Sequence, residues 1–323
     1  MEAGSLRNLD LNLLPALDAL LRDRNVTRAA QRLGLSQPAV SAALGRLRRH
    51  FGDELLHRNG NRYELTPLAE QLGARTASAL LGVQRVFDAT PDFDPATSQR
   101  EFTLMMSDYA VTTLGDHLAT AVARQAPGVR LRFEANSTYA VDHAPDTLQG
   151  IDGIVLPHGF LTDTPVLDLY EDTWVCVVSA DNTDVGERLT MDDLARLPWV
   201  VTYHRATAFT PAAAQLRMIG VTPDVHVVVE SFLAVPFLVA GTGRIALLQA
   251  ALAHRLAAAA GVRVLACPWE VVPLKEAFWW HPSFRTDPAH AWLRGVLRAA
   301  GAAVTAAAVV AAAADDRPVT TGV

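Results

Sequence analysis

The feature that most constrains the fold is a tight turn, Gly34-Leu35-Ser36, between two short amphipathic segments. Gly34 can adopt the left-handed conformation that ends a helix, and Ser36 can cap the N-terminus of the next one. Pro38 is tolerated in the first turn of that second helix. The sequence therefore predicts two short helices in immediate succession.

Apolar residues recur at helical spacing in three stripes, two before this turn and one after it. The three stripes are Leu13, Leu17, Leu20 and Leu21; Val26, Ala29, Ala30 and Leu33; and Val40, Leu44, Leu47 and Phe51. Each has the spacing of a helix that is buried along one face, so together they predict a tri-helical unit. After it in the sequence, the polar triplet Asn59-Gly60-Asn61 lies between the pair Leu55-Leu56 and the residues Tyr63 and Leu65, which predicts a small β-hairpin.

The third predicted helix has a small, polar face opposite its apolar stripe. A helix that lies in the DNA major groove needs such a face, because bulky side chains would hold its backbone away from the base edges. Gln37 is the main predicted reader, since its amide can form two hydrogen bonds with adenine. The other predicted DNA contacts are Arg28, Ser36, Pro38, Ser41, Arg46, Arg48, Arg49, Arg58 and Arg62, with the arginines serving mainly to neutralise phosphates. On these residues alone, a three-helix bundle with a solvated polar face is the alternative.

Charge is unevenly distributed along the chain. Residues 1–65 contain ten Arg against seven Asp or Glu, whereas the remainder contains 18 basic and 27 acidic residues. Only the front of the chain therefore suits a phosphate backbone. With 323 residues, the chain also exceeds what one hydrophobic core usually serves, so two or more domains are expected.

A longer helix is predicted over residues 67–89, and turn-forming residues at 90–98 mark a domain boundary. The helix has a heptad-like seam of Leu72, Thr76, Ala79, Val83 and Val86, with a second seam at Leu80 and Phe87. Such a helix needs a partner, and we expect a second copy of the chain.

Strand-like and helix-like segments alternate beyond this boundary. The candidate strands are 102–106, 129–133, 151–156, 174–178, 200–202, 225–229 and 245–248, with helices such as 115–124 and 232–240 between some of them. This alternation predicts an α/β fold with a largely parallel sheet.

Motifs of catalysis and metal binding are absent from the sequence. It has no Gly-x-Ser-x-Gly motif and no Gly-Lys pair, and its histidines and two cysteines lack ligand spacing. We therefore expect no enzymatic activity, no metal and no cofactor, with buried thiols at Cys176 and Cys267. The Ala-rich run 302–314 is shorter than the roughly 20 residues of a membrane span, and no secretory signal is visible. A cytoplasmic location without membrane contact is expected.

Four motifs in register resemble the N-terminal signature of LysR-type transcriptional regulators. They are Leu9-Asp10-Leu11-Asn12-Leu13-Leu14, Val26-Thr27-Arg28-Ala29-Ala30, Leu35-Ser36-Gln37-Pro38-Ala39-Val40-Ser41 and Leu65-Thr66-Pro67. Later motifs, including Phe93-Asp94-Pro95 and Trp280-His281-Pro282, are similar to the branch that contains the nodulation regulators and several aromatic-responsive activators.

The resemblance implies three parts and a tail. These are a winged helix-turn-helix over 1–66, a dimerising linker helix over 67–92, an effector-binding domain over 93–305 and a disordered tail over 306–323. The effector-binding domain would fold like periplasmic solute-binding proteins, with two α/β lobes around a cleft. One lobe would comprise about 100–167 plus 268–305, and the other 168–267.

Strand ends, taken with the resemblance, indicate which residues face the cleft. They are Ser107, Asp108, Tyr109, Ser137, His158, Thr202, Tyr203, His204, Phe232 and Trp280. Asp108 stands where many relatives carry a small or hydroxyl residue. This set suits a small aromatic or hydroxylated molecule.

The implied function is that of a sequence-specific regulator that binds double-stranded DNA and is controlled by a small-molecule effector. The resemblance further implies a dimer or tetramer, and contact with RNA polymerase if the protein is an activator. Two alternatives stay open. One is a small-molecule-binding or enzymatic α/β protein whose N-terminal helices serve only oligomerisation, and the other is an architectural DNA-binding protein without a ligand.

Overall fold

The chain divides into two compact units in the computed structural model, which describes residues 10–59, 62–87, 92–202 and 210–315. One unit comprises residues 1–90 with 145–150, and the other comprises residues 91–144 with 151–323. Each unit has its own hydrophobic core.

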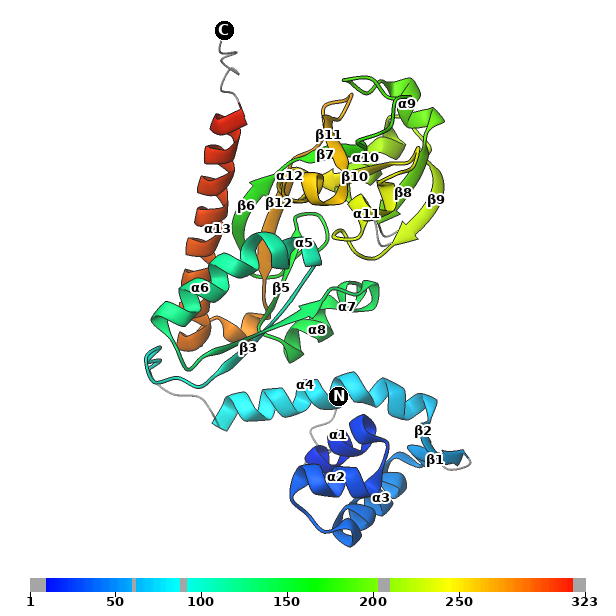
Figure 1. Cartoon of the computed structure of the whole chain (residues 1–323). Helices are drawn as coiled ribbons and strands as arrows, with labels where there is room; N and C mark the ends of the chain where they lie inside the picture. The colour runs from blue at the N-terminus through cyan, green and yellow to red at the C-terminus, as the bar shows by residue number, and fades with distance from the viewer. Residues whose placement is uncertain (1–9, 60–61, 88–91, 203–209, 316–323) are drawn as a thin grey trace. The chain divides into compact units, whose positions relative to one another are not determined.

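The N-terminal unit contains the predicted helices and hairpin (Figure 1). Its elements are α1 (Leu13–Asp23), α2 (Val26–Leu33), α3 (Gln37–Phe51), the antiparallel strands β1 (Leu56–Asn59) and β2 (Arg62–Leu65), and the long helix α4 (Pro67–Phe87). Leu17 and Leu20 of α1 pack with Val40, Leu44 and Leu47 of α3 in one core. The three predicted apolar stripes are therefore confirmed as a buried tri-helical core.

The turn between α2 and α3 has the predicted chemistry. Gly34 ends α2 with a φ of 64°, a left-handed conformation that side chains with a Cβ adopt at a cost. The Ser36 hydroxyl accepts a hydrogen bond from the backbone N–H of Ala39 at 3.4 Å, which caps α3, and Pro38 lies in the first turn.

The C-terminal unit contains two five-stranded sheets. The first has the order β4-β3-β5-β12-β6 and comprises β3 (Glu101–Met106), β4 (Arg130–Ala135), β5 (Gly153–Pro157), β6 (Val166–Asp172) and β12 (Leu274–Trp279). Its lobe also contains α5 (Asp108–Ala110), α6 (Asp116–Gln125), α7 (Thr138–Asp142) and α13 (Pro288–Asp315), and α8 (Ala144–Gly150) lies between α7 and β5 in the sequence. Helix α13 packs along β6 and α6 (Figure 1).

The second sheet has the order β11-β7-β10-β8-β9. It comprises β7 (Trp174–Ser179), β8 (Pro198–Thr202), β9 (Asp224–Val229), β10 (Ile245–Gln249) and β11 (Val262–Ala266), accompanied by α9 (Met191–Arg196), α10 (Pro211–Met218), α11 (Val235–Val239) and α12 (Ala250–Ala260). The chain crosses between the two sheets at Thr173 and again over residues 267–273. Strand β6 stays in the first sheet up to Asp172, beyond the lobe boundary expected at 167–168.

Both sheets are mixed, so the expectation of a largely parallel sheet was wrong. Strands β3, β4 and β5 pair in parallel, as do β8, β9 and β10, but β12 runs antiparallel to β5 and β6, and β7 runs antiparallel to β10 and β11. Three of the strands involved, β6, β11 and β12, were not among the candidate strands. Apolar periodicity identifies a strand but carries no information on the direction of its partner.

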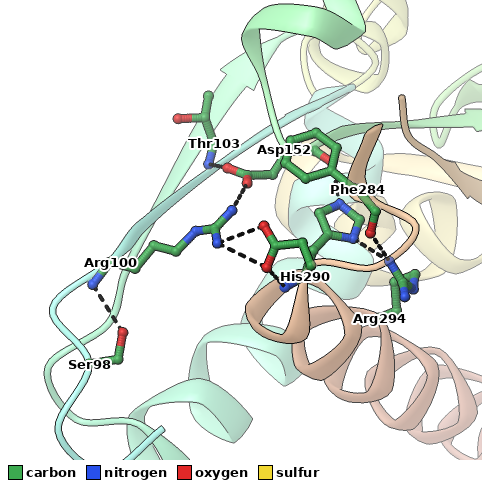
Figure 2. A network of polar contacts seen from close by, with 8 residues as sticks. Ser98, Arg100, Thr103, Asp152, Phe284, His290 and Arg294 are labelled. Atoms are coloured by element: carbon green, nitrogen blue, oxygen red, sulfur yellow. Dashed lines mark hydrogen bonds and ion pairs between the residues drawn. The ribbon is translucent and has the colours of Figure 1, made fainter. Parts of the chain in front are cut away.

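A network of charged groups connects three segments of the first lobe (Figure 2). The Arg100 guanidinium donates to Asp152 at 2.9 Å and to Asp287 at 3.0 Å. The other carboxylate oxygen of Asp152 accepts from the backbone N–H of Thr103 at 2.8 Å, and His290 contacts the Asp152 carbonyl at 2.7 Å. The network thus ties the starts of β3, β5 and α13, which lie far apart in the sequence.

Three further features concern the last helix, the two cysteines and the apolar character of the helices. Helix α13 continues to Asp315, so residues 306–315 are helical and not the disordered tail that was expected, while 316–323 lie outside the described residues. Cys176 is buried and Cys267 is half-buried, with their sulfur atoms 3.8 Å apart. Within the described ranges, none of the helices combines the length and apolar character required to cross a membrane.

Candidate DNA-binding surface and ligand cavity

Helix α3 exposes a small, polar face on one side. Gln37, Pro38, Ser41 and Gly45 are exposed, while Val40 on the opposite side is fully buried. The backbone of α3 is therefore unobstructed along the exposed face, and an amide and a hydroxyl stand at its N-terminal end. This is the geometry that a major groove accepts.

A basic groove lies between the start of α2 and the hairpin. Its lining contains four arginines, Arg22, Arg24, Arg28 and Arg58, together with Asp23, Asn25, Tyr63 and Glu64. The Arg28 guanidinium donates to the Asp23 carbonyl at 2.6 Å, and Arg22 pairs with Asp18 at 2.9 Å. Groups of this kind neutralise DNA phosphates.

The arginines near the end of α3 have different surroundings. Arg48 donates to the backbone carbonyls of Glu54 and Leu56, each at 2.8 Å, and pairs with the Glu54 carboxylate at 2.9 Å. It therefore braces α3 against β1. Arg49 is exposed, and Arg46 lies 3.8 Å from Asp10. The Arg62 side chain lies outside the described residues.

The C-terminal unit contains a cavity of about 90 Å³ between its two sheets. A single water molecule needs about 10–15 Å³ by this measure, so the cavity has room for a small organic molecule. The first lobe lines it with Ser107, Asn136, Ser137, Thr138, Val141, Val155, Leu156, Pro157, Phe160, Leu274 and Glu276, and the second lobe with Trp174, Thr210, Pro211, Phe232 and Gln249.

Glu276 is the acidic residue in this lining, and it is 4% exposed. Burial, followed by the negative charge of Asp172, raises the pKa of Glu276 to about 8. The strand carrying Glu276 has a β-bulge between Glu276 and Ala277, an irregularity that re-aims side chains next to binding sites. Asp172 accepts a hydrogen bond from the Tyr109 hydroxyl at 2.8 Å, and burial raises the pKa of Asp172 as well.

Both units match models of one protein family. Residues 11–70 match the model described as the bacterial regulatory helix-turn-helix protein of the lysR family, and residues 95–302 match the LysR substrate binding domain. The chain belongs to the LysR family. It is a LysR-type transcription regulator with a helix-turn-helix and a substrate-binding domain.

Relatives support this assignment over nearly the whole length. The chain is 34% identical to Nodulation protein D 2 of Bradyrhizobium diazoefficiens, covering 90% of this chain and 88% of the relative, and 35% identical to Nodulation protein D 1 of Rhizobium tropici, covering 90% and 94%. Among solved structures, it is similar to the probable transcriptional regulator PA0477 of Pseudomonas aeruginosa, with a TM-score of 0.67 and 33% identity over 91% of this chain and 98% of the other. Full-length CbnR in complex with target DNA shares the fold at a TM-score of 0.63 and 15% identity, over 90% of this chain and all of that one.

Three of the predicted effector residues of this LysR-family chain line the cavity: Ser107, Ser137 and Phe232. The hydroxyl of Ser107 accepts from the backbone N–H of Ala110, and that of Ser137 accepts from the backbone N–H of Ala140, each at 3.1 Å. Both serines therefore cap short helices that begin just after strands.

Asp108 and Tyr109 lie beside the cavity without lining it. The Asp108 carboxylate accepts from the Ser231 hydroxyl at 2.7 Å and from the backbone N–H groups of Phe232 and Leu233 at 3.2 and 3.1 Å. It thus holds the loop that carries Phe232 against the first lobe. Tyr109 is fully buried and its hydroxyl is bound to Asp172.

Three further predicted effector residues, at positions 158, 202 and 280, do not line the cavity. His158 contacts Asp168 at 2.7 Å near the end of β5, Thr202 is buried at the end of β8, and Trp280 stacks with Phe278. Tyr203 and His204 lie outside the described residues. Whether a residue at a strand end faces a cleft depends on the direction of the strand and on the side of the sheet. Apolar periodicity specifies neither, and β12, which directly precedes Trp280, was not among the candidate strands.

Six polar lining residues were missed: Asn136, Thr138, Trp174, Thr210, Gln249 and Glu276. Gln249 ends an apolar strand and Glu276 interrupts another, so a buried polar side chain inside a strand was the signal available in the sequence. Arg22 and Arg24 of the basic groove were missed too, although they stand within three residues of each other in the sequence.

Proposed function

We propose that this regulator reads DNA with the exposed face of α3 and is controlled by a small molecule that binds in the cavity between the lobes. The observation that supports it best is the contrast on α3, where Gln37, Ser41 and Gly45 are exposed along one face and Val40 is buried on the other. A helix with only a structural role gains no stability from an exposed face of small and polar residues.

The proposed DNA contacts divide into two kinds. Gln37 and Ser41 face base edges and supply sequence preference, and Arg49, with Arg28 and Arg58 of the basic groove, contacts phosphates. Arg48 positions the hairpin through Glu54 and Leu56. The groove adds Arg22 and Arg24 to the phosphate-binding set.

We further propose a homo-oligomer built through α4. Val83, Val86 and Phe87 of this helix are exposed by 39%, 72% and 83%, which is unfavourable for a helix in water, and a second copy of α4 would cover them. LysR regulators oligomerise and bind DNA and small-molecule effectors. A cytoplasmic location, contact with RNA polymerase in the case of an activator, and the lack of enzymatic activity complete the proposal.

A gel-shift titration of the full-length chain tests the DNA part. The probes are the duplex that flanks its own gene and a random duplex of equal length, each at two salt concentrations. Gln37→Ala should weaken binding to the specific duplex by about 1–3 kcal/mol and leave the random duplex nearly unchanged, because a base contact is lost. Arg49→Ala should weaken both and reduce the salt slope by about 0.9, because a phosphate contact is lost.

Arg132→Ala is the matched control, since Arg132 is an exposed arginine of the C-terminal unit paired with Glu101. It should leave both affinities and the salt slope unchanged. Equal affinity of the wild-type chain for both duplexes would contradict the proposed function.

A further inference from the structure

The cavity between the lobes contains buried polar atoms that lack hydrogen-bond partners. These are Asn136 Oδ1, Trp174 Nε1, Gln249 Oε1 and Glu276 Oε2, and all four residues line the cavity. Trp174, Gln249 and Glu276 are each at least nine-tenths buried, with exposures of 2%, 2% and 4%. Native proteins rarely leave buried polar atoms unpaired, and several at one cavity indicate that bound molecules, either ordered water or a ligand that displaces it, supply the missing hydrogen bonds.

Asn136 Oδ1 and Gln249 Oε1 can only accept a hydrogen bond, and Glu276 Oε2 is an acceptor when its carboxyl group is ionised. The Asn136 amide nitrogen already donates to the Val155 carbonyl at 3.5 Å, which leaves its oxygen as the unpaired atom. A primary ammonium group has three N–H donors and no acceptor, so it matches a set of three acceptor oxygens. A carboxylate ligand has only acceptors, so it would leave Asn136 Oδ1 and Gln249 Oε1 unpaired.

The charge of the lining points the same way. None of the lining residues in the described part of the chain is Arg, Lys or His, whereas Glu276 is acidic. The titratable groups that face Glu276 from the packed elements are Asp172, Tyr109 and Tyr170, and these add negative charge or none. Its sequence neighbour Lys275 pairs with Glu171 at 2.9 Å on the exposed side of the sheet.

We propose that this cavity recognises a small primary amine, with the ammonium group held by Glu276, Gln249 and Asn136 and with Trp174 donating to an acceptor, or to the ring face, on the apolar body of the ligand. The proposal rests on the proposed function of the cavity as the effector site. The apolar remainder of the lining, with Val155, Leu156 and Phe232 among it, suits a single ring.

A pH dependence follows from the position of Glu276. Because burial and Asp172 raise the pKa of Glu276 to about 8, the empty cavity holds a neutral carboxyl group at pH 7. An ammonium ligand favours the ionised carboxylate, so binding releases one proton. Affinity should rise about tenfold per pH unit from pH 6 to 8, and then level off until the amine itself loses its proton.

Benzylamine, benzyl alcohol and benzoate are matched probes, because they share one ring and differ in the head group. Their dissociation constants are measured with the full-length chain by ligand-observed NMR at pH 6, 7 and 8. At pH 8 benzylamine should bind at least tenfold more tightly than benzyl alcohol, and benzoate should not bind at 10 mM. Benzylamine that binds no more tightly than benzoate, or whose affinity is flat between pH 6 and 8, overturns the assignment.

Glu276→Gln, compared with the exposed control Glu171→Gln, locates the effect. Glu276→Gln should weaken benzylamine at least tenfold at pH 8 and change benzyl alcohol less than threefold, while Glu171→Gln changes neither. Unchanged benzylamine binding in a folded Glu276→Gln overturns the proposal, and if that variant does not fold, the pH profile of the wild-type chain decides. If none of the three probes binds but the gel shift is intact, the amine proposal is refuted and the proposed regulator function is not. If benzylamine binds selectively but the chain does not prefer its own DNA, the regulator function is refuted and the amine proposal is not.

Discussion

The two units differ in how far apart along the chain their interacting residues lie. In the N-terminal unit, the α2–α3 turn and the exposed polar face of α3 are formed by residues 34–51, and the hairpin follows directly. In the C-terminal unit, one charged network joins Arg100, Asp152 and Asp287, and one cavity joins Ser107 to Glu276. A surface made from neighbouring residues is set by local capping and periodicity, whereas a cavity made from distant strands depends on every strand pairing between them.

This difference predicts where single changes do the most damage. Long-range charged contacts should matter most to the stability of the C-terminal unit, and a local cap in the N-terminal unit should matter less and should affect that unit alone. All six tryptophans, at 174, 199, 269, 279, 280 and 292, belong to the C-terminal unit, so tryptophan fluorescence follows the unfolding of that unit alone.

Arg100→Ala should have the largest effect. It leaves Asp152 and Asp287, whose side chains are only 11% and 22% exposed, without their cation, and breaking such a pair costs about 3–5 kcal/mol. Urea unfolding followed by tryptophan fluorescence measures the loss. Arg132→Ala, which breaks an exposed pair with Glu101, should cost less than about 1 kcal/mol. Equal losses in the two variants would contradict the importance of the long-range network.

The pH dependence of the same network should come next. Burial is the main cause that lowers the pKa of His290 to about 4 in the folded chain, against about 6.5 when unfolded. Between these values the unfolded chain binds a proton that the folded chain does not, so the free energy of unfolding should fall by about 3 kcal/mol as the pH decreases from 6.5 to 4. Urea titrations across this window should show a shallower fall for His290→Gln, and parallel curves would refute the assignment.

Ser36→Ala should have the smallest effect. It removes the cap of α3, which costs about 1 kcal/mol and corresponds to about fivefold faster amide exchange in α3. Hydrogen exchange of peptides covering 37–51, read by mass spectrometry, measures this change. The tryptophan-monitored transition should stay where it is, and a shift of that transition would show that the two units are not independent in stability.

The same difference explains what the sequence could predict. The three helices, the hairpin and the Gly34–Ser36 turn were all predictable, because each depends on residues within a few positions of one another. Of the predicted effector residues, Ser107, Ser137 and Phe232 line the cavity, and these residues follow strands or cap helices. Glu276 and Gln249 could be noticed as polar residues in apolar strands, but their place at the cavity could not be predicted. It depends on β12 lying between β5 and β6 and on β10 lying between β7 and β8, and no local pattern specifies those placements.

The arrangement of the lobes depends on how the chain passes between the two sheets. Strand β6 ends at Asp172 and β7 begins at Trp174, so Thr173 alone separates them, and the return passage over 267–273 runs nearby because β11 pairs with β7 and β12 with β6. No strand pairing of the described residues joins the two sheets, so a rotation of the lobes about an axis through these two passages would break none. A molecule enclosed beside that axis therefore needs to change only one angle to signal its presence.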